Sequence, residues 1–315
     1  MDTIVRSSFP TVKKKPLVVR LRKQLSLQLM VLLGIGFIVV FRFLPIYGLQ
    51  LAFKELLPGK GIWEARWVGW KHFNDFFFSG SAGKVLFNTL ALSGLKICIG
   101  FPMPVIFALL LNELRSHRTR SIVQGISYLP HFLSWVVISG VIWGIVARES
   151  GVINNLLLTL GIIAEPIHFL GTPSMFWPMM VILDIWKEMG WSAIIYMASI
   201  ASIDPQLYEA ARVDGASRWV QTLKITIPAI APTVAIMLIL RVGSILNAGF
   251  DQILVFRNSI THDVANILDV YVYDMGLVNG RFGYATAVGL FQSVVGFIMI
   301  MTTNKLANRF EMGLW

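Results

Sequence analysis

Cysteine and charge are both scarce in this chain of 315 residues. The single cysteine, Cys98, lies inside an apolar run, which excludes an intrachain disulfide framework and a CxxC metal site. Charged residues make up 14% of the sequence, against about 25% in soluble domains. Because 56% of the residues are hydrophobic and the mean hydropathy is +0.69, the composition predicts an integral, multi-pass protein of the cell membrane.

Motifs that bind nucleotides, metals or acyl substrates are missing as well. The chain has no GxxxxGK[ST] loop for a nucleoside triphosphate, no HExxH pair for a metal and no GxSxG turn for a hydrolase nucleophile. An intramembrane enzyme would need paired ionisable groups on facing helices, and Asp184 with Glu188 are the only candidates. We therefore predict a transport protein rather than an enzyme, with no catalytic residue, no metal and no cofactor in this chain.

Six apolar runs are each long enough to cross about 30 Å of hydrocarbon as a helix. They cover residues 25–44, 85–111, 122–146, 176–200, 229–246 and 285–303. The predicted fold class is therefore an all-α integral membrane protein with six transmembrane helices. We expect one transmembrane domain over residues 25–315, preceded by a basic cytoplasmic segment over residues 1–24.

Positive charge is distributed unevenly between the loops. Cations gather before the first run, between the second and third, between the fourth and fifth, and after the sixth. The positive-inside rule makes these four segments cytoplasmic, so both chain termini are predicted to lie inside the cell. The contrast is reduced by five cations in the first outer loop, which are Lys54, Lys60, Arg66, Lys71 and Lys84.

The segment 204–228 is polar although it lies between two apolar runs. Asp204 is a good helix N-cap, so a helix is predicted to begin there. Gly215 allows a sharp turn because glycine tolerates positive φ, and a second short helix is expected over 217–225 before Pro228 resets the chain into the fifth run. Loops between helices are typically about 2–8 residues long. This longer loop therefore has a fold of its own, which a groove of another protein could accept.

The same loop, within residues 201–228, resembles the cytoplasmic coupling motif of ATP-binding-cassette importer permeases. That motif reads EAA, two further residues, DGA, and then a stop of the I-x-x-P type. The matching residues here are Glu209, Ala210, Ala211, Asp214, Gly215, Ala216 and Pro228. The resemblance implies that the loop seats in a cleft of a separate ATPase subunit, which would bind ATP and Mg in place of this chain.

Other segments resemble the carbohydrate-uptake branch of these permeases, in particular the subgroup for oligosaccharides derived from pectin, alginate and aldouronate-type polysaccharides. They are NTLALS at 88–93, YLPHFLSWVVISGVIWG at 128–144 and FGYATAVGLFQSVVGF at 282–297. The resemblance implies a second homologous permease, two ATPase subunits, an extracytoplasmic solute-binding protein and transport by alternating access. A self-contained secondary transporter is the alternative, although the inverted repeats with broken half-helices that it predicts are not recognisable.

Ionisable side chains at membrane depth are costly and mark a transport pathway. Lys187 has Asp184 and Glu188 on its own helix as partners that would neutralise it without a ligand. Arg241 has no such partner in its own run, and an unmatched guanidinium suits forked binding of a carboxylate. This favours acidic, uronate-bearing oligosaccharides as cargo. The alternatives are an ion pair of Arg241 with Asp184 or Glu188 across helices, and a neutral oligosaccharide, phosphate or peptide cargo.

Aromatic and polar side chains in and next to the third, fourth and fifth runs complete the predicted pathway. Sugar rings stack on aromatic faces, although most tryptophans in membrane helices serve packing or lie at the interface. His131 is more typical of a satisfied core residue than of a ligand, and side chains near the outer end of the fifth run would bond sugar hydroxyls or cap a helix. The predicted pathway residues are Trp135, Trp143, Trp186, Lys187, Glu188, Tyr196, Arg241, Asn247 and Asp251.

Overall fold

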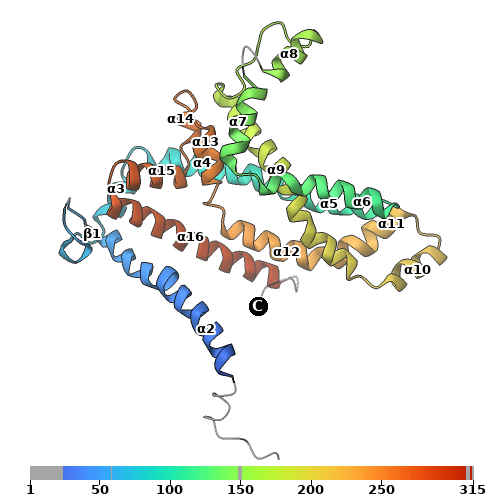
Figure 1. Cartoon of the computed structure of the whole chain (residues 1–315), viewed down its shortest axis with the longest axis horizontal. Coiled ribbons are helices and arrows are strands. Elements are labelled where there is room, and N and C mark those ends of the chain that lie inside the picture. The colour runs from blue at the N-terminus through green and yellow to red at the C-terminus, as the bar shows by residue number, and fades with distance from the viewer. Residues whose placement is uncertain (1–23, 58, 148–150, 310–312, 314–315) are drawn as a thin grey trace, which may run out of the picture. The chain divides into compact units, whose positions relative to one another are not determined.

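The computed structural model describes residues 24–57, 59–147, 151–309 and 313 (Figure 1). The predicted basic segment 1–24 lies outside these residues except for Gln24. The chain divides into two units, residues 1–50 and residues 51–315. The first unit contains α2 (Leu25–Ile38), the π-helical turn η1 (Val39–Phe43) and most of the 3-10 helix η2 (Leu44–Phe53). No residue of α2 or η1 is buried, as expected of an apolar helix whose surface lipid would cover.

The second unit is built almost entirely from helices. One short hairpin, which the sequence did not predict, pairs β1 (Lys54–Glu55) antiparallel with β2 (Arg66–Trp67). The predicted helical membrane fold is otherwise confirmed. The helical elements are η3 (Ile62–Glu64), α3 (Lys71–Phe77), α4 (Ala82–Leu95), η4 (Lys96–Gly100), α5 (Pro102–Glu113), α6 (His117–Tyr128), η5 (Leu129–Phe132), α7 (Trp135–Ile145), α8 (Val152–Thr159), α9 (Pro173–Ala201), α10 (Pro205–Val213), α11 (Arg218–Gln221), η6 (Thr222–Thr226), α12 (Ile227–Gly243), α13 (Phe250–Phe256), α14 (His262–Ala265), α15 (Leu268–Tyr273), η7 (Asp274–Val278) and α16 (Phe282–Asn308).

Among the described residues, four helical stretches are long and apolar enough to cross a membrane. They are Leu25–Phe53, Ala82–Glu113, Arg218–Gly243 and Phe282–Asn308. The helix α9 has 29 residues, which exceeds the roughly 20 needed for a crossing, but it carries three charged side chains. The count of six spans stays a prediction.

The third apolar run is broken, and the expectation of one continuous helix over 122–146 is wrong. The axis of His117–Phe132 and that of α7 differ by 102°. Pro130 lies in the 3-10 turn η5 and has no backbone N–H for a helical hydrogen bond. Ser134 then starts a new helix by accepting a hydrogen bond from the Val137 backbone N–H at 3.3 Å.

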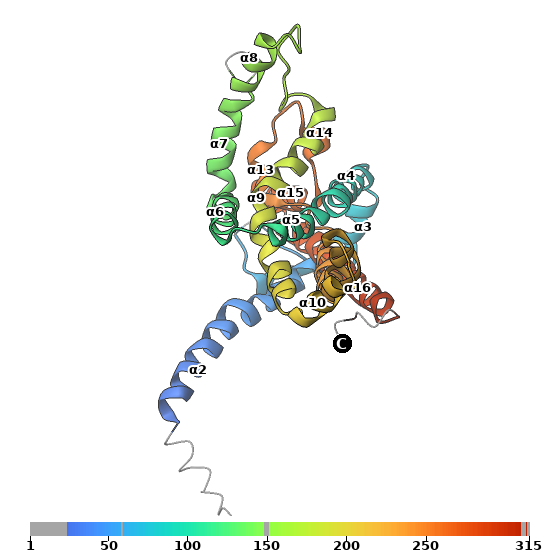
Figure 2. The same cartoon turned by 90° about the vertical axis from the view of Figure 1, so that its right-hand side faces the viewer.

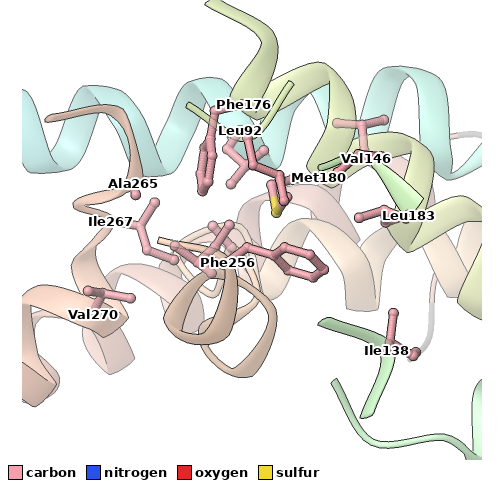
Figure 3. Packing of buried hydrophobic residues seen from close by; sticks show 14 residues of the cluster. Leu92, Ile138, Val146, Phe176, Met180, Leu183, Phe256, Ala265, Ile267 and Val270 are labelled. Atoms are coloured by element: carbon pink, nitrogen blue, oxygen red, sulfur yellow. The ribbon is translucent and has the colours of Figure 1, made fainter. Parts of the chain in front are cut away.

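The long helix α9 is central to the second unit, where it packs against α5, α6 and α12, and α12 packs in turn against α16. An apolar cluster forms where α9 meets α4, α7 and α13, with Phe176, Met180, Leu92 and Phe256 fully buried (Figure 3). Within this unit, Figure 1 shows α10 and α11 at one end and α3, α15 and the hairpin toward the opposite end. Figure 2 shows α10 from the end of the unit. This separation fits the predicted assignment of these loops to opposite membrane faces.

Candidate functional site

A cavity of about 670 Å³ lies among η4, α5, α9 and α12. Its walls are mostly apolar and aromatic, and they include Trp191 and Tyr196. Its charged lining residues are Lys96, Asp184, Glu188 and Arg241. An apolar hollow with a few converging charged groups is typical of a small-molecule binding site.

Lys96 is the most enclosed charge in this cavity, with 3% of its side chain exposed. Its Nζ donates hydrogen bonds to Asp184 Oδ1 at 3.1 Å and to Gln252 Oε1 at 2.7 Å. The amide of Gln252 in turn donates to the Met180 carbonyl at 2.8 Å. Gly249, with φ of 104°, lets the backbone approach, because a Cβ there would lie 2.8 Å from Lys96 Nζ. The buried ammonium is thus held by α9 and α13 together.

Sequence analysis did not place Lys96 or Gln252 in the site. A signal for Lys96 was available, since it is the single charge within an apolar run and such charges mark functional sites. Lys96 also begins the π-helical turn η4, and π-turns inside helices are frequent at functional sites. That second signal exists only in three dimensions.

Arg241 lies on the other side of Asp184, with its NH2 3.7 Å from Asp184 Oδ2. This separation makes an ion pair but exceeds the range of a direct hydrogen bond. The arginine side chain is 42% exposed, so part of the guanidinium remains accessible from the cavity. The structure therefore realises the alternative of a pair across helices, and it does so loosely.

Lys187 is neutralised by Glu188 rather than by Asp184. Its buried Nζ lies 3.2 Å from Glu188 Oε1 and donates to the His131 carbonyl at 2.7 Å. Glu188 Oε2 lies 2.8 Å from His131 Nδ1, and the His131 ring stacks on Trp191 with ring centroids 4.6 Å apart. Trp135 lies beneath the lysine, with its ring centroid 5.6 Å from Nζ. These contacts attach the bend between α6 and α7 to α9.

The structure brings three predicted pathway residues to the cavity, namely Glu188, Tyr196 and Arg241. Asn247 is instead hydrogen bonded by the Gln292 amide, and Asp251 lies exposed in the first turn of α13. The predicted residues outside the cavity lining are Trp135, Trp143, Trp186, Lys187, Asn247 and Asp251.

The charges around the cavity do not cancel. Asp184 compensates Lys96, and Glu188 compensates Lys187, which reaches it from outside the cavity. Arg241 has only the loose share of Asp184 that Lys96 leaves. Leaving the histidine aside, three cations face two carboxylates, so the surplus positive charge lies at Arg241. An anion entering the cavity would meet this guanidinium.

The polar loop between α9 and α12 has the predicted local structure at its beginning and its turn. The Asp204 side chain accepts a hydrogen bond from the Gln206 N–H at 2.9 Å, which confirms the predicted cap of α10. Gly215 has φ of 75°, so the sharp turn is confirmed as well. Ser217 caps α11 by accepting from the Val220 N–H at 3.4 Å.

Pro228 does not reset the chain, and that expectation is wrong. Helical structure continues from Arg218 to Gly243 without a break. The π-helical turn η6 ends two residues before the proline, and the Ile227 N–H bonds back to the Thr222 carbonyl. Pro228 then takes an early position of α12, where an N–H is not required.

The end of this loop is fastened to the C-terminal end of α5. Glu113 Oε2 pairs with Arg218 NH1 at 3.3 Å, and Glu113 Oε1 accepts from the Thr222 hydroxyl at 3.3 Å. The Tyr208 hydroxyl lies 2.9 Å from that of Thr226, and these residues line a hollow of about 590 Å³.

The exposed face of the 201–228 loop is accessible to a partner. Val213 is 88% exposed and Trp219 is 70% exposed, so both apolar side chains are available for contact with another protein. Of the predicted coupling residues, Ala211 and Ala216 are half-buried. The exposed ones are Glu209, Ala210, Asp214, Gly215 and Pro228.

Comparison with known proteins places this geometry in context. Residues 100–311 match the family described as "Binding-protein-dependent transport system inner membrane component". The chain is similar to Protein LplB of Bacillus subtilis (strain 168), with 42% identity over 291 residues that cover 92% of this chain and 91% of LplB. It is also similar to the polygalacturonan/rhamnogalacturonan transport system permease protein YteP of the same organism, with 41% identity over 308 residues that cover 98% of this chain and 95% of YteP.

A solved structure resembles the fold over nearly its whole length. It is a chain in the crystal structure of a bacterial ABC transporter involved in the import of the acidic polysaccharide alginate, with a TM-score of 0.84 and 38% sequence identity. The match covers 93% of this chain and 98% of that chain. The same values hold for a structure of the bacterial alginate ABC transporter in complex with an alginate pentasaccharide-bound periplasmic protein.

Proposed function

The chain belongs to the family of binding-protein-dependent transport system inner membrane components, and we propose that it imports acidic, uronate-containing oligosaccharides. It is a multi-pass permease subunit of an ABC importer and not an enzyme. The proposed cargo class is argued from the side chains that line the cavity.

The observation that carries the cargo proposal is the surplus positive charge at Arg241. A guanidinium binds a carboxylate through two parallel N–H···O bonds, and it does so more strongly where apolar walls exclude water. Trp191 and Tyr196 line the same cavity and offer faces on which sugar rings would stack. Alginate and polygalacturonan, named for two of the similar proteins, are acidic polysaccharides, which supports the same class.

The partners of this permease follow from the same proposal. A second, homologous permease completes the pathway, and two ATPase subunits bind ATP and Mg and close on the exposed face of the 201–228 loop. An extracytoplasmic solute-binding protein delivers the oligosaccharide, and alternating access moves it inward. Residues 25–315 form the permease domain in this proposal, with 1–24 as a basic cytoplasmic segment.

The test compares a uronate oligosaccharide with its own methyl ester, which has the same sugar skeleton without the negative charge. Uptake would be measured in proteoliposomes that contain the permease with its ATPase, partner permease and cognate binding protein. Because the binding protein also selects cargo, the permease's share is read from Arg241→Gln with every other subunit unchanged.

We expect Arg241→Gln to raise the apparent KM for the free acid by about tenfold, since a hydrogen bond to a charged group contributes about 1.5–3 kcal/mol and the site is partly exposed. The ester should be unaffected. Lys71→Gln serves as the matched control, because it removes an exposed cation that pairs with Glu55 away from the cavity. Equal uptake of acid and ester by the unmodified importer would refute the acidic cargo and favour a neutral oligosaccharide.

A further inference from the structure

Asp184 divides its two carboxylate oxygens between two cations of very different exposure. Oδ1 accepts a hydrogen bond from Lys96 at 3.1 Å, and Oδ2 lies 3.7 Å from the guanidinium of Arg241. Arginine and carboxylate prefer a forked arrangement in which both oxygens accept at once. Lys96 competes with Arg241 for one of these two oxygens, and at 3.7 Å the forked arrangement is not formed.

The position of Lys96 is fixed from several sides. Gln252, itself 1% exposed, accepts from Nζ at 2.7 Å and is held by the Met180 carbonyl. Gly249 passes so close that any side chain there would meet the ammonium group. With 3% of its side chain exposed, Lys96 is too enclosed to bind a sugar carboxylate directly.

We propose that Lys96 is a positioning residue that keeps Arg241 available for the negatively charged group of the cargo. It does so by engaging Asp184, which would otherwise close on Arg241 as a forked ion pair. The carboxylate of the oligosaccharide then completes the bonding of Arg241 that Asp184 leaves incomplete. This inference rests on the proposed import of acidic oligosaccharides and assigns to Lys96 a role in their selection.

The test removes first the charge of Lys96 and then the carboxylate that it restrains. In Lys96→Gln, Asp184 is free to pair with Arg241, so the apparent KM for the free uronate should rise about tenfold relative to its methyl ester. In the double variant Lys96→Gln with Asp184→Asn, no carboxylate remains to capture Arg241. The preference for the acid over the ester should therefore return to the level of the unmodified importer.

The ratio of acid to ester uptake separates a positioning role from a structural one. A merely structural lysine would change the uptake of both sugars equally in Lys96→Gln, and that result would overturn the proposal. Loss of the acid preference in the double variant would also overturn it, because Lys96 would then itself be the anion-binding group. The double variant contains no unpaired buried charge, so it gives an answer even where Lys96→Gln alone fails to assemble.

The failures of the two proposals are distinguishable. Absence of acid preference in the unmodified importer defeats both the proposed cargo and the role of Lys96. Preference that is lost in Arg241→Gln but kept in Lys96→Gln leaves the acidic cargo intact and overturns the role of Lys96 alone. Lys71→Gln is again the control for removal of a cation outside the cavity.

Discussion

Replacing Gln252 tests whether the charged groups of the cavity are held as a network. The side chain is buried, accepts a 2.7 Å hydrogen bond from Lys96 and donates a 2.8 Å bond to the Met180 carbonyl. Gln252→Leu removes both bonds at similar side-chain volume. Gln252→Glu is the matched variant, since it keeps an acceptor for Lys96 and adds a negative charge.

The expected loss in Gln252→Leu is dominated by the bond to the ammonium of Lys96. A hydrogen bond to a charged group contributes about 1.5–3 kcal/mol to the free energy of unfolding. The Met180 carbonyl lies inside α9 and still accepts its helical hydrogen bond in the variant, so loss of the bond from the Gln252 amide costs little. Burial of the leucine offsets part of the loss, which leaves a net destabilisation of about 1–2 kcal/mol.

The assay is equilibrium unfolding of the purified permease in mixed micelles with increasing SDS. Gln252→Leu should lower the free energy of unfolding by this amount, while Gln252→Glu should stay near the unmodified protein. The glutamate should also weaken the preference for acidic cargo, because a second carboxylate near Lys96 cancels the surplus charge at Arg241. A leucine variant as stable as the unmodified chain, or a glutamate variant as unstable as the leucine one, would refute the network.

Two further predictions concern segments outside the cavity. Gly215→Pro should abolish stimulation of ATP hydrolysis by the loaded binding protein, because proline cannot adopt the φ of 75° found there, whereas Gly215→Asn should retain it because asparagine tolerates this region; equal stimulation in both variants would contradict the reasoning. A hydrogen bond and the charge of Lys84 lower the pKa of Asp263, so their contact stabilises the folded chain above the ordinary aspartate pKa and is lost as the pH falls through the lowered value. The protection of the α14 amide hydrogens against exchange, relative to the intrinsic exchange rate at each pH, should accordingly fall below about pH 4, and Asp263→Asn should remove this fall.

The features that the sequence predicted correctly depend on neighbouring residues. The cap at Asp204 is set by its own carboxylate, and the turn at Gly215 by the absence of a side chain there. The helical membrane class follows from composition, which needs no knowledge of contacts. The effects of Pro130 and Pro228 could not be predicted from neighbouring residues, because proline breaks the helix at the first position and is accommodated within a helix at the second. The π-helical turn before Pro228 allows the helix to continue past this proline, and no local sequence pattern predicted that turn.

The charge network escaped prediction because its members are far apart in the chain. Lys96 and Asp184 are separated by 88 residues, and Lys96 and Gln252 by 156. Helical spacing suggested Asp184 as a partner of Lys187, but spacing within one helix cannot show that Lys96, on a different helix, already pairs with that aspartate. The surplus charge at Arg241 was predicted from its own run, and the residue that maintains it was not.

The connection between the cavity and the exposed loop is short. The cavity-lining residues Asp184 and Glu188 belong to α9, and residues 202–204 alone separate this helix from α10. On the far side of the loop, α11, η6 and α12 form one continuous helical stretch that carries Arg241. A partner that moves the loop therefore acts on both helices that hold the opposing charges of the cavity. Because the Asp184–Arg241 separation is already at the limit of an ion pair, a small relative shift of α9 and α12 would change the affinity for an anion.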